Sequence, residues 1–272
     1  MSPYRWFITD VDGTLLDADN NLPDANRAAL EELKRAGVPV VLATGRRWTT
    51  LKRVLDRLQL WNLTDYAIAN NGAVIKDLRT RTLLHHEGFV PSAVTAAAEM
   101  LDALGWDPLA LTYVPDGGPD VYHRRLSLRN GDFVAKNEGH TVLIDDFREL
   151  EARAVVELIL LGSEADLSRA QAALAPLDME TALIKNTFYA DYMLEVTPRG
   201  VSKLSGARLL GARLGLSPAE AVAVGDSAND LPLLREAGRA VAMAHAPEPV
   251  RGAAHEVATV AEAARRWFPA AP

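Results

Sequence analysis

The sequence predicts an α/β protein with a doubly wound, Rossmann-like parallel-sheet core that is interrupted by an inserted α+β module. Two observations carry this prediction. Short apolar runs that end in polar, glycine-containing loops alternate with amphipathic helices at both ends of the chain, and the middle of the chain lacks this alternation. The core is therefore expected at residues 1–82 and 198–272, and the insert at residues 83–197, each boundary to within about four residues.

The first strand and helix show the pattern most clearly. Residues 7–9 form a short apolar, β-favouring run that stops at Asp10-Val11-Asp12-Gly13, where acids and a glycine predict a loop. The helix that follows has Pro23 at its expected first position and Gly37 at its expected C-terminal cap. One strand, one polar loop and one helix are thus predicted before residue 38.

The alternation then repeats. Residues 38–42 form a continuous apolar run, typical of a strand buried on both faces, and it ends at Ala43-Thr44-Gly45-Arg46 before a helix that carries four leucine or valine residues. Residues 66–69 predict another strand, which ends at Asn70-Asn71-Gly72. Three strands that each end in a polar loop indicate a parallel sheet with crossover helices.

The middle and the end of the chain differ. A helix at 92–104, strands at 155–161, 179–184 and 193–196, and a helix near 167–174 predict an antiparallel sheet with helices on one face. From Val201 the first pattern resumes. The elements predicted there are a helix beginning near 201, strands at 221–224 and 240–243, and helices at 229–237 and 260–268.

Composition excludes several functional classes. The 29 basic and 36 acidic residues give a formal charge of −7, and no long basic run is present to bind nucleic acid or an anionic membrane. The absence of cysteine excludes disulfides, thiolate catalysis and cysteine zinc sites.

The first residues lack the pattern of a secretion signal, so a cytoplasmic protein without nucleic-acid or membrane partners is expected. The oligomeric state is not predicted.

Four polar residues follow strands of the predicted core. In an open parallel sheet, ligands bind beyond the carboxyl ends of the strands, so Asp10, Asp12, Thr44 and Asp226 are expected to converge. Three carboxylates at one place repel one another unless a divalent cation neutralises them. Oxygen ligands select a hard ion, and Mg²⁺ is therefore the expected cofactor.

The segment Asp10-Val11-Asp12-Gly13-Thr14-Leu15-Leu16 resembles the first motif of the haloacid dehalogenase-like phosphatases. Thr44-Gly45-Arg46 resembles their second motif, Lys203 their third, and Gly225-Asp226-Ser227-Ala228-Asn229-Asp230-Leu231 their fourth, in the expected order. Asn71-Gly72-Ala73 and Val241-Ala242-Met243-Ala244 are similar to the Cof-like sugar-phosphatase branch, which carries an α/β cap domain between motifs two and three. His245 departs from that branch, whose members commonly carry asparagine there.

The resemblance implies four catalytic residues. Asp10 is the expected nucleophile, because a carboxylate that attacks phosphorus in line divides one hard hydrolysis into two easier steps. Asp12 is the expected general acid and base. The Thr44 hydroxyl and the Lys203 ammonium are expected to hold phosphoryl oxygens.

The resemblance also implies the ligands of the metal and of the substrate. Mg²⁺ is expected on Asp10, Asp226 and the backbone carbonyl of Asp12, with Asp230 supporting these ligands without touching the ion. The expected substrate-binding residues are Thr44, Gly45, Arg46, Asn71, Lys203 and Asn229. From the cap, Arg124, Lys136 and Asn186 are candidates for substrate contacts.

Simpler interpretations remain open for single residues. Asp-x-Asp-Gly alone is commonly a turn, Thr44-Gly45 could cap a helix, Lys203 could be solvated, and Asn71 could merely adopt a left-handed turn. Only the ordered set of motifs favours function.

The predicted function is Mg²⁺-dependent hydrolysis of a small phosphorylated metabolite, such as a sugar phosphate, through an aspartyl-phosphate. A phosphomutase or phosphotransferase that uses the same intermediate is the nearest alternative. A phospho-accepting receiver protein is a second alternative, against which the large insert argues.

Overall fold

The computed structural model describes residues 2–115, 117–185, 189 and 191–269. The chain folds into two compact units, which we describe separately. The first unit comprises residues up to 46, 50–85 and 202 onward, and the second comprises residues 47–49 and 86–201. The sequence placed the two boundaries near 82 and 198, three to four residues earlier in each case.

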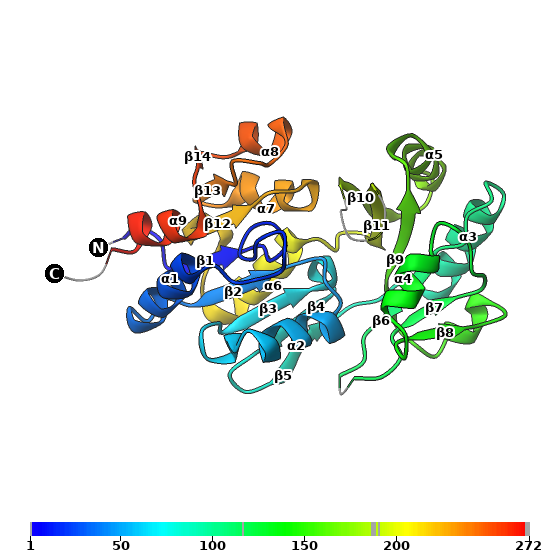
Figure 1. Ribbon diagram of the computed structural model, residues 1–272, viewed down its shortest axis with the longest axis horizontal. Helices are drawn as coiled ribbons and strands as arrows, with labels where there is room; N and C mark the ends of the chain where they lie inside the picture. The colour runs from blue at the N-terminus through cyan, green and yellow to red at the C-terminus, as the bar shows by residue number, and fades with distance from the viewer. Residues whose placement is uncertain (1, 116, 186–188, 190, 270–272) are drawn as a thin grey trace. The chain divides into compact units, whose positions relative to one another are not determined.

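The first unit contains a sheet in which strands from the N-terminal and the C-terminal parts of the chain lie side by side (Figure 1). Six neighbouring strands are parallel, and β4 then pairs antiparallel with β3. In spatial order the strands are β14 (Glu256–Val257), β13 (Arg239–Ala242), β12 (Ala221–Gly225), β1 (Trp6–Thr9), β2 (Val40–Ala43), β3 (Tyr66–Ala69), β4 (Val74–Asp77) and β5 (Thr82–His86).

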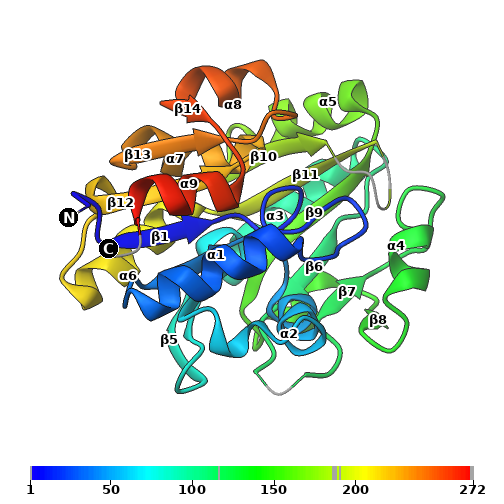
Figure 2. The same ribbon diagram turned by 60° about the vertical axis from the view of Figure 1, so that its left-hand side comes forward.

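Helices cover both faces of this sheet because successive residues of a strand point to opposite sides. Trp6 and Ile8 of β1 belong to a buried cluster with α6 (Lys203–Leu214) and α7 (Leu231–Glu236). Phe7 of β1 points the other way and meets Phe268, which follows α9 (Val260–Trp267), at a centroid separation of 6.3 Å. Helix α1 (Asp24–Arg35) packs beside α9, as Figure 2 shows.

This part of the chain contains further helical elements. They are α2 (Trp48–Arg57), α8 (Glu248–Ala253) and the 3₁₀ turns at Leu60–Asn62, Asn70–Gly72, Pro218–Glu220 and Ala228–Asp230. The predicted α/β class with a doubly wound parallel core is confirmed by this topology.

The second unit is an α+β module built on one sheet. Its strands in spatial order are β10 (Met179–Lys185), β11 (Tyr192–Pro198), β9 (Val155–Gly162), β6 (Leu109–Thr112), β7 (Val121–His123) and β8 (Thr141–Leu143). All pairs are antiparallel except β7 with β8. Helices α3 (Pro91–Asp102) and α5 (Glu164–Leu174) share its buried cluster, and α4 (Gly131–Lys136) and a 3₁₀ turn at Phe147–Leu150 complete it.

Several short elements have no counterpart in the sequence prediction. Strands β4, β5 and β14 and helix α8 are each too short, or too exposed, to show a clear hydrophobic period. Pro23 is the N-cap of α1 rather than its first helical residue, because the helix begins at Asp24. None of the helices in the described part of the chain has the length and apolar character that a bilayer crossing requires.

Helix α6 packs against the sheet with almost no space between backbones. A Cβ atom added to Gly206 would lie 2.5 Å from Ile68 Cγ2 and 3.2 Å from the α-carbon of Gly72. Gly72 is itself at φ +113°, and a Cβ atom there would lie 2.2 Å from the carbonyl oxygen of Ser202. These two glycines allow the N-terminal turn of α6, which carries Lys203, to approach the carboxyl end of the sheet.

Replacing Gly206 by alanine tests this close approach. In an unconstrained helix, alanine is more stabilising than glycine by about 1 kcal/mol. Overpacking a core instead lowers the free energy of unfolding by about 1–3 kcal/mol. We therefore expect Gly206→Ala to lower the free energy of unfolding by up to about 2 kcal/mol in urea titrations. Gly252→Ala in α8 is the matched control, since its Cβ would meet only the flexible end of Glu248 at 3.3 Å. Equal stability of the two variants would contradict the packing argument.

Candidate active site

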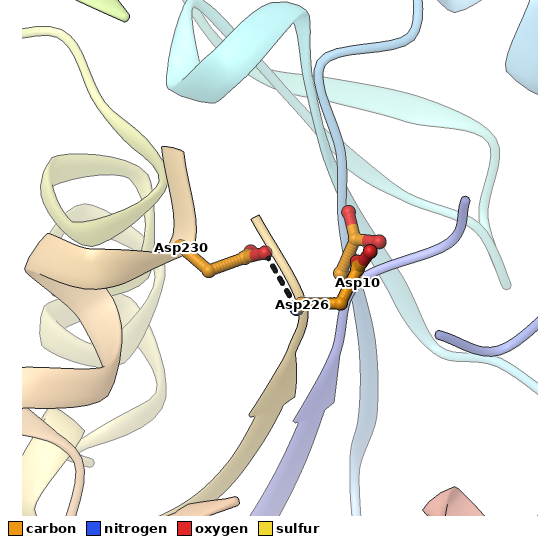
Figure 3. A group of neighbouring side chains, drawn as sticks. All are labelled: Asp10, Asp226 and Asp230. Atoms are coloured by element: carbon orange, nitrogen blue, oxygen red, sulfur yellow. Dashed lines mark hydrogen bonds between the residues drawn. The ribbon is translucent and has the colours of Figure 1, made fainter. Parts of the chain in front are cut away.

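The acidic residues of the site follow neighbouring parallel strands. Asp10 follows β1 and Asp226 follows β12, and the Asp10 N–H donates to the carbonyl oxygen of Val224 at 2.9 Å. Because the two strands run parallel and in register, both carboxylates lie at the same edge of the sheet (Figure 3). Asp230 faces them from the turn that precedes α7. Thr44 follows β2, the strand on the other side of β1.

A buried lysine joins two of these carboxylates. Lys203 Nζ donates to Asp10 Oδ1 and to Asp230 Oδ1, at 2.7 Å in each case. The lysine and both acids are almost completely buried. Lys203 is the first residue of α6, and the N-cap residue Ser202 accepts a hydrogen bond from the Ser205 N–H. This capped helix start fixes the position of the Lys203 backbone. The lysine therefore holds the Asp10 side chain in place.

The ionisation of this group reflects burial and charge together. Burial raises the pKa of Asp10 well above its ordinary value, against the opposing charge of Lys203, and the neighbouring carboxylates raise it further. Burial alone would lower the pKa of Lys203, but Asp10 and Asp230 outweigh it and raise that pKa. Lys203 is thus held as a cation, while burial and the neighbouring acids disfavour the carboxylate form of Asp10.

Three carboxylates here fit a divalent cation. Asp10, Asp226 and Asp230 each offer an oxygen atom, and these atoms lie within 4.8 Å of one another. With all three ionised, the single ammonium of Lys203 leaves two negative charges in a largely buried place, and a dication balances them. Oxygen ligands of this kind suit Mg²⁺.

Asp230 uses its oxygens for other partners. One binds Lys203, and the other accepts from the backbone N–H groups of Asp226 and Ser227 at 3.1 and 3.0 Å, the first of which is dashed in Figure 3. This pattern agrees with a residue that orients Asp226 and Lys203. Its predicted role, which is to support the metal ligands without touching the ion, remains a prediction.

Asp226 is oriented by two residues that the sequence did not single out as site residues. Thr14 Oγ1 donates to its Oδ1 at 2.9 Å, and His245 Nε2 lies 3.3 Å from its Oδ2. Burial raises the pKa of Asp226, and Asp230 adds to the rise, against the Thr14 hydrogen bond. Thr14 lies within the first motif, and His245 was noted in the sequence only as a departure from the asparagine that the branch commonly carries, so neither was assigned a role.

Gly13 leaves the space in which this arrangement fits. Its φ is +74°, and a Cβ atom added there would lie 2.9 Å from Asp226 Oδ2 and 3.4 Å from His245 Nε2. The glycine of the first motif is therefore required both by the backbone conformation and by the contact with Asp226.

Asp12 is held by an arginine. Arg46 Nε donates to Asp12 Oδ2 at 2.7 Å, and Arg46 Nη2 donates to Asp12 Oδ1 and to Asn20 Oδ1. Arg46, a predicted substrate-binding residue, thus contacts the predicted general acid in this structure. The side chain of Asp12 is about one-third exposed, which leaves it accessible to a leaving group or to water.

The remaining predicted substrate-binding residues also lie around the ends of the core strands. The Thr44 hydroxyl accepts from the Arg46 N–H at 3.0 Å, across Gly45. Asn229 Nδ2 donates to Asn71 Oδ1 at 3.0 Å. Asn71 adopts the left-handed conformation that the simpler interpretation anticipated, at φ +52°, and also makes this polar contact. Their contacts with substrate remain predictions.

The candidates from the second unit have structural partners. Arg124 pairs with Asp107 at 2.8 Å and stacks over the ring of Phe147. Lys136 lies over the ring of Tyr189 at 5.2 Å. Asn186 lies outside the described residues.

Comparisons with known proteins identify the family. A model of haloacid dehalogenase-like hydrolases matches residues 7–264. YxeH of Bacillus subtilis (strain 168), whose name assigns it provisionally to the phosphatases, is 27% identical over 261 residues, which cover 92% of this chain and 91% of YxeH.

Solved structures share the fold. A haloacid dehalogenase-like hydrolase from Bacteroides thetaiotaomicron has a TM-score of 0.78 at 24% identity, covering 97% of this chain and 100% of its own. The subclass IIB sugar phosphatase BT4131 has a TM-score of 0.74 at 23% identity, covering 97% and 96% of the two chains. At these identities the structures establish the fold.

The raised pKa values of Asp10 and Asp226 predict how Mg²⁺ binding depends on pH. A carboxyl group with a folded-state pKa above its ordinary value of about 3.9 contributes stability below that value, and this contribution is lost as the pH rises through the folded-state pKa. Mg²⁺ binds the ionised form. The increase in Tm caused by Mg²⁺ is therefore expected to be larger at about pH 8 than at about pH 5.

Thermal unfolding in EDTA and in Mg²⁺ at both pH values measures this difference. Asp226→Asn, which removes one titrating carboxyl group of the cluster, is expected to show a smaller Mg²⁺ effect and a weaker pH dependence. An Mg²⁺-induced shift of the same size at both pH values in the wild type would contradict the prediction.

Gly13→Ala tests the contact with Asp226. The left-handed backbone costs alanine about 1–2 kcal/mol, and the added methyl group displaces the Asp226 carboxylate. We expect Mg²⁺ affinity, measured by calorimetric titration, to fall at least about tenfold. Gly37→Ala is the control, because Gly37 has φ +70° with no atom within 4 Å of the added Cβ. Unchanged Mg²⁺ affinity in Gly13→Ala would show that the close contact does not orient Asp226.

Proposed function

This chain belongs to the haloacid dehalogenase-like hydrolase family, and we propose that it is a Mg²⁺-dependent phosphatase that acts on a small phosphorylated metabolite. The observation that supports this proposal most strongly is the buried Asp10 carboxylate, held by Lys203 beside Asp226 and Asp230. A nucleophile fixed by a cation, within an oxygen-ligand cluster, is the arrangement that phosphoryl transfer requires.

In the first step, an Asp10 oxygen attacks the phosphorus atom in line with the leaving oxygen. The new O–P bond forms as the bond to the leaving oxygen breaks, and Asp12 gives its proton to that oxygen. Lys203 and the Thr44 hydroxyl stabilise the charge on the phosphoryl oxygens. The product of this step is an aspartyl-phosphate on Asp10 and a free alcohol.

In the second step, water attacks the phosphorus atom of the aspartyl-phosphate. Asp12 now takes a proton from that water, the acyl phosphate bond breaks, and Asp10 is released as a carboxylate with inorganic phosphate. The exposed position of Asp12 at the edge of the site suits both proton transfers.

The proposed cation site is formed by Asp10, Asp226 and the backbone carbonyl of Asp12. Mg²⁺ bound there supplies charge neutralisation for the phosphoryl oxygens and for the acidic cluster. Thr14, His245 and Asp230 hold Asp226 in the orientation that such binding needs.

Sugar phosphates are the first substrate class to test. The fold is shared with BT4131, which is a sugar phosphatase, although specificity within a fold depends on the site. The net charge of −7 and the lack of a long basic run support a small metabolite, rather than nucleic acid or a membrane surface, as the partner.

The test is phosphate release from a panel of sugar, triose, nucleotide and cofactor phosphates, in Mg²⁺ and in EDTA. We expect Mg²⁺-dependent release, and a loss of more than about a thousandfold in Asp10→Asn, which lacks the nucleophile. Analysis of the organic product separates hydrolysis from transfer. An isomerised sugar phosphate without net phosphate release would indicate a phosphomutase, and release that persists in Asp10→Asn would overturn the nucleophile assignment.

A further inference from the structure

A short loop between β1 and α1 is held in one conformation by hydrogen bonds within the loop. Asp17 Oδ1 accepts from the N–H groups of Asp19 and Asn21, at 3.0 and 2.8 Å. The backbones of Asp17 and Asn21 are also paired, and the Asn20 N–H donates to the Asp17 carbonyl, both at 3.0 Å. Asn20 adopts φ +61°, a left-handed conformation that asparagine tolerates well.

This loop presents Asn20 to the site. The Asn20 side-chain oxygen accepts from Arg46 Nη2, and its backbone carbonyl accepts from Arg57 Nη2 of helix α2. Among the described residues, the side chain of neighbouring Asn21 makes no hydrogen bond and is exposed. Asn20 is therefore the residue of this loop whose side chain reaches the Arg46 guanidinium.

Arg46 is restrained at both ends of its side chain. Its backbone N–H donates to the Thr44 hydroxyl, and its carbonyl accepts from the Asn70 N–H at 2.9 Å. Its guanidinium donates from two nitrogen atoms to the two oxygens of Asp12 while Nη2 also contacts Asn20. A planar guanidinium that binds a carboxylate through two nitrogens fixes the plane of that carboxylate.

We infer that Asn20, acting through Arg46, is a positioning residue that sets the orientation of the Asp12 carboxylate for proton transfer. The inference rests on the proposed function, in which Asp12 is the general acid and base. It also gives Arg46 a role other than the predicted substrate contact. A substrate ligand would mainly affect KM, whereas a residue that orients the acid affects the rate of the first step for substrates whose leaving group needs a proton.

Leaving groups of different acidity distinguish these roles. Nitrophenolate departs without protonation, whereas a sugar alkoxide requires a proton from the general acid. The probes are p-nitrophenyl phosphate and the sugar phosphate that the wild-type enzyme hydrolyses fastest. The variant is Asn20→Gly, because glycine removes the side-chain oxygen and still tolerates the positive φ.

We expect Asn20→Gly to slow the first step, measured as leaving-group release in a single turnover, about tenfold for the sugar phosphate and less than about twofold for p-nitrophenyl phosphate, with KM little changed. Asn21→Gly adds the same flexibility to the same loop and should leave both rates near wild type. Asn20→Asp keeps an acceptor oxygen in place and should restore most of the sugar-phosphate rate.

Equal losses on the two substrates, or a rise in KM alone, would overturn the inference. Asp12→Asn separates this failure from a failure of the proposed function. Asp12→Asn could lose much more activity on the sugar phosphate than on p-nitrophenyl phosphate while Asn20→Gly behaves like the wild type. In that case Asp12 is the general acid, but Asn20 does not position it. A loss in the first-step rate of Asp12→Asn that is independent of the leaving group would overturn both.

Discussion

The first unit is organised around one buried ammonium group. Lys203 Nζ binds Asp10 and Asp230, and neither the lysine nor either acid has appreciable contact with solvent. Burying an ion is costly unless it is paired, and breaking such a pair costs about 3–5 kcal/mol. Three segments that are far apart in the sequence must therefore meet at one point: the end of β1, the start of α6 and the turn before α7. The same contact that satisfies the lysine also fixes the proposed nucleophile.

This requirement explains features elsewhere in the unit. The start of α6 reaches the sheet edge only because Gly206 and Gly72 let backbones approach within a distance that a Cβ atom would prevent. Gly225 has a similar role, since a Cβ atom there would lie 2.4 Å from Asp230 Cγ. Small residues around the site thus create the space in which large charged side chains converge.

The site contains two separate charge arrangements with different chemical purposes. The Asp10, Asp226 and Asp230 cluster retains excess negative charge after pairing with Lys203, which suits a divalent cation. Asp12 instead forms a bidentate pair with Arg46. In the proposed function, this separation keeps the general acid and base apart from the acidic cluster, so that one edge of the sheet carries both electrostatic stabilisation and proton transfer.

Local sequence patterns determined the α/β class, most long strands and helices, and the four motif segments, because burial on a strand or helix leaves a period that can be read residue by residue. The strand ends after β1, β2 and β12 could be placed from these periods, and Asp10, Asp226 and Thr44 with them. Strands β4 and β5 are as long as the predicted strands, but β4 ends in a lysine and an aspartate and β5 is partly exposed, so neither forms a continuous apolar run. Elements β14 and α8 contain too few residues to show a period.

The partners of charged groups were decided only in three dimensions. Lys203 and Asp10 are 193 positions apart, and the Arg46 contacts with Asp12 and Asn20 depend on how loops meet at the sheet edge. A one-dimensional pattern records which side chains are polar, but the direction and distance between two of them are set by the packing of the elements that carry them.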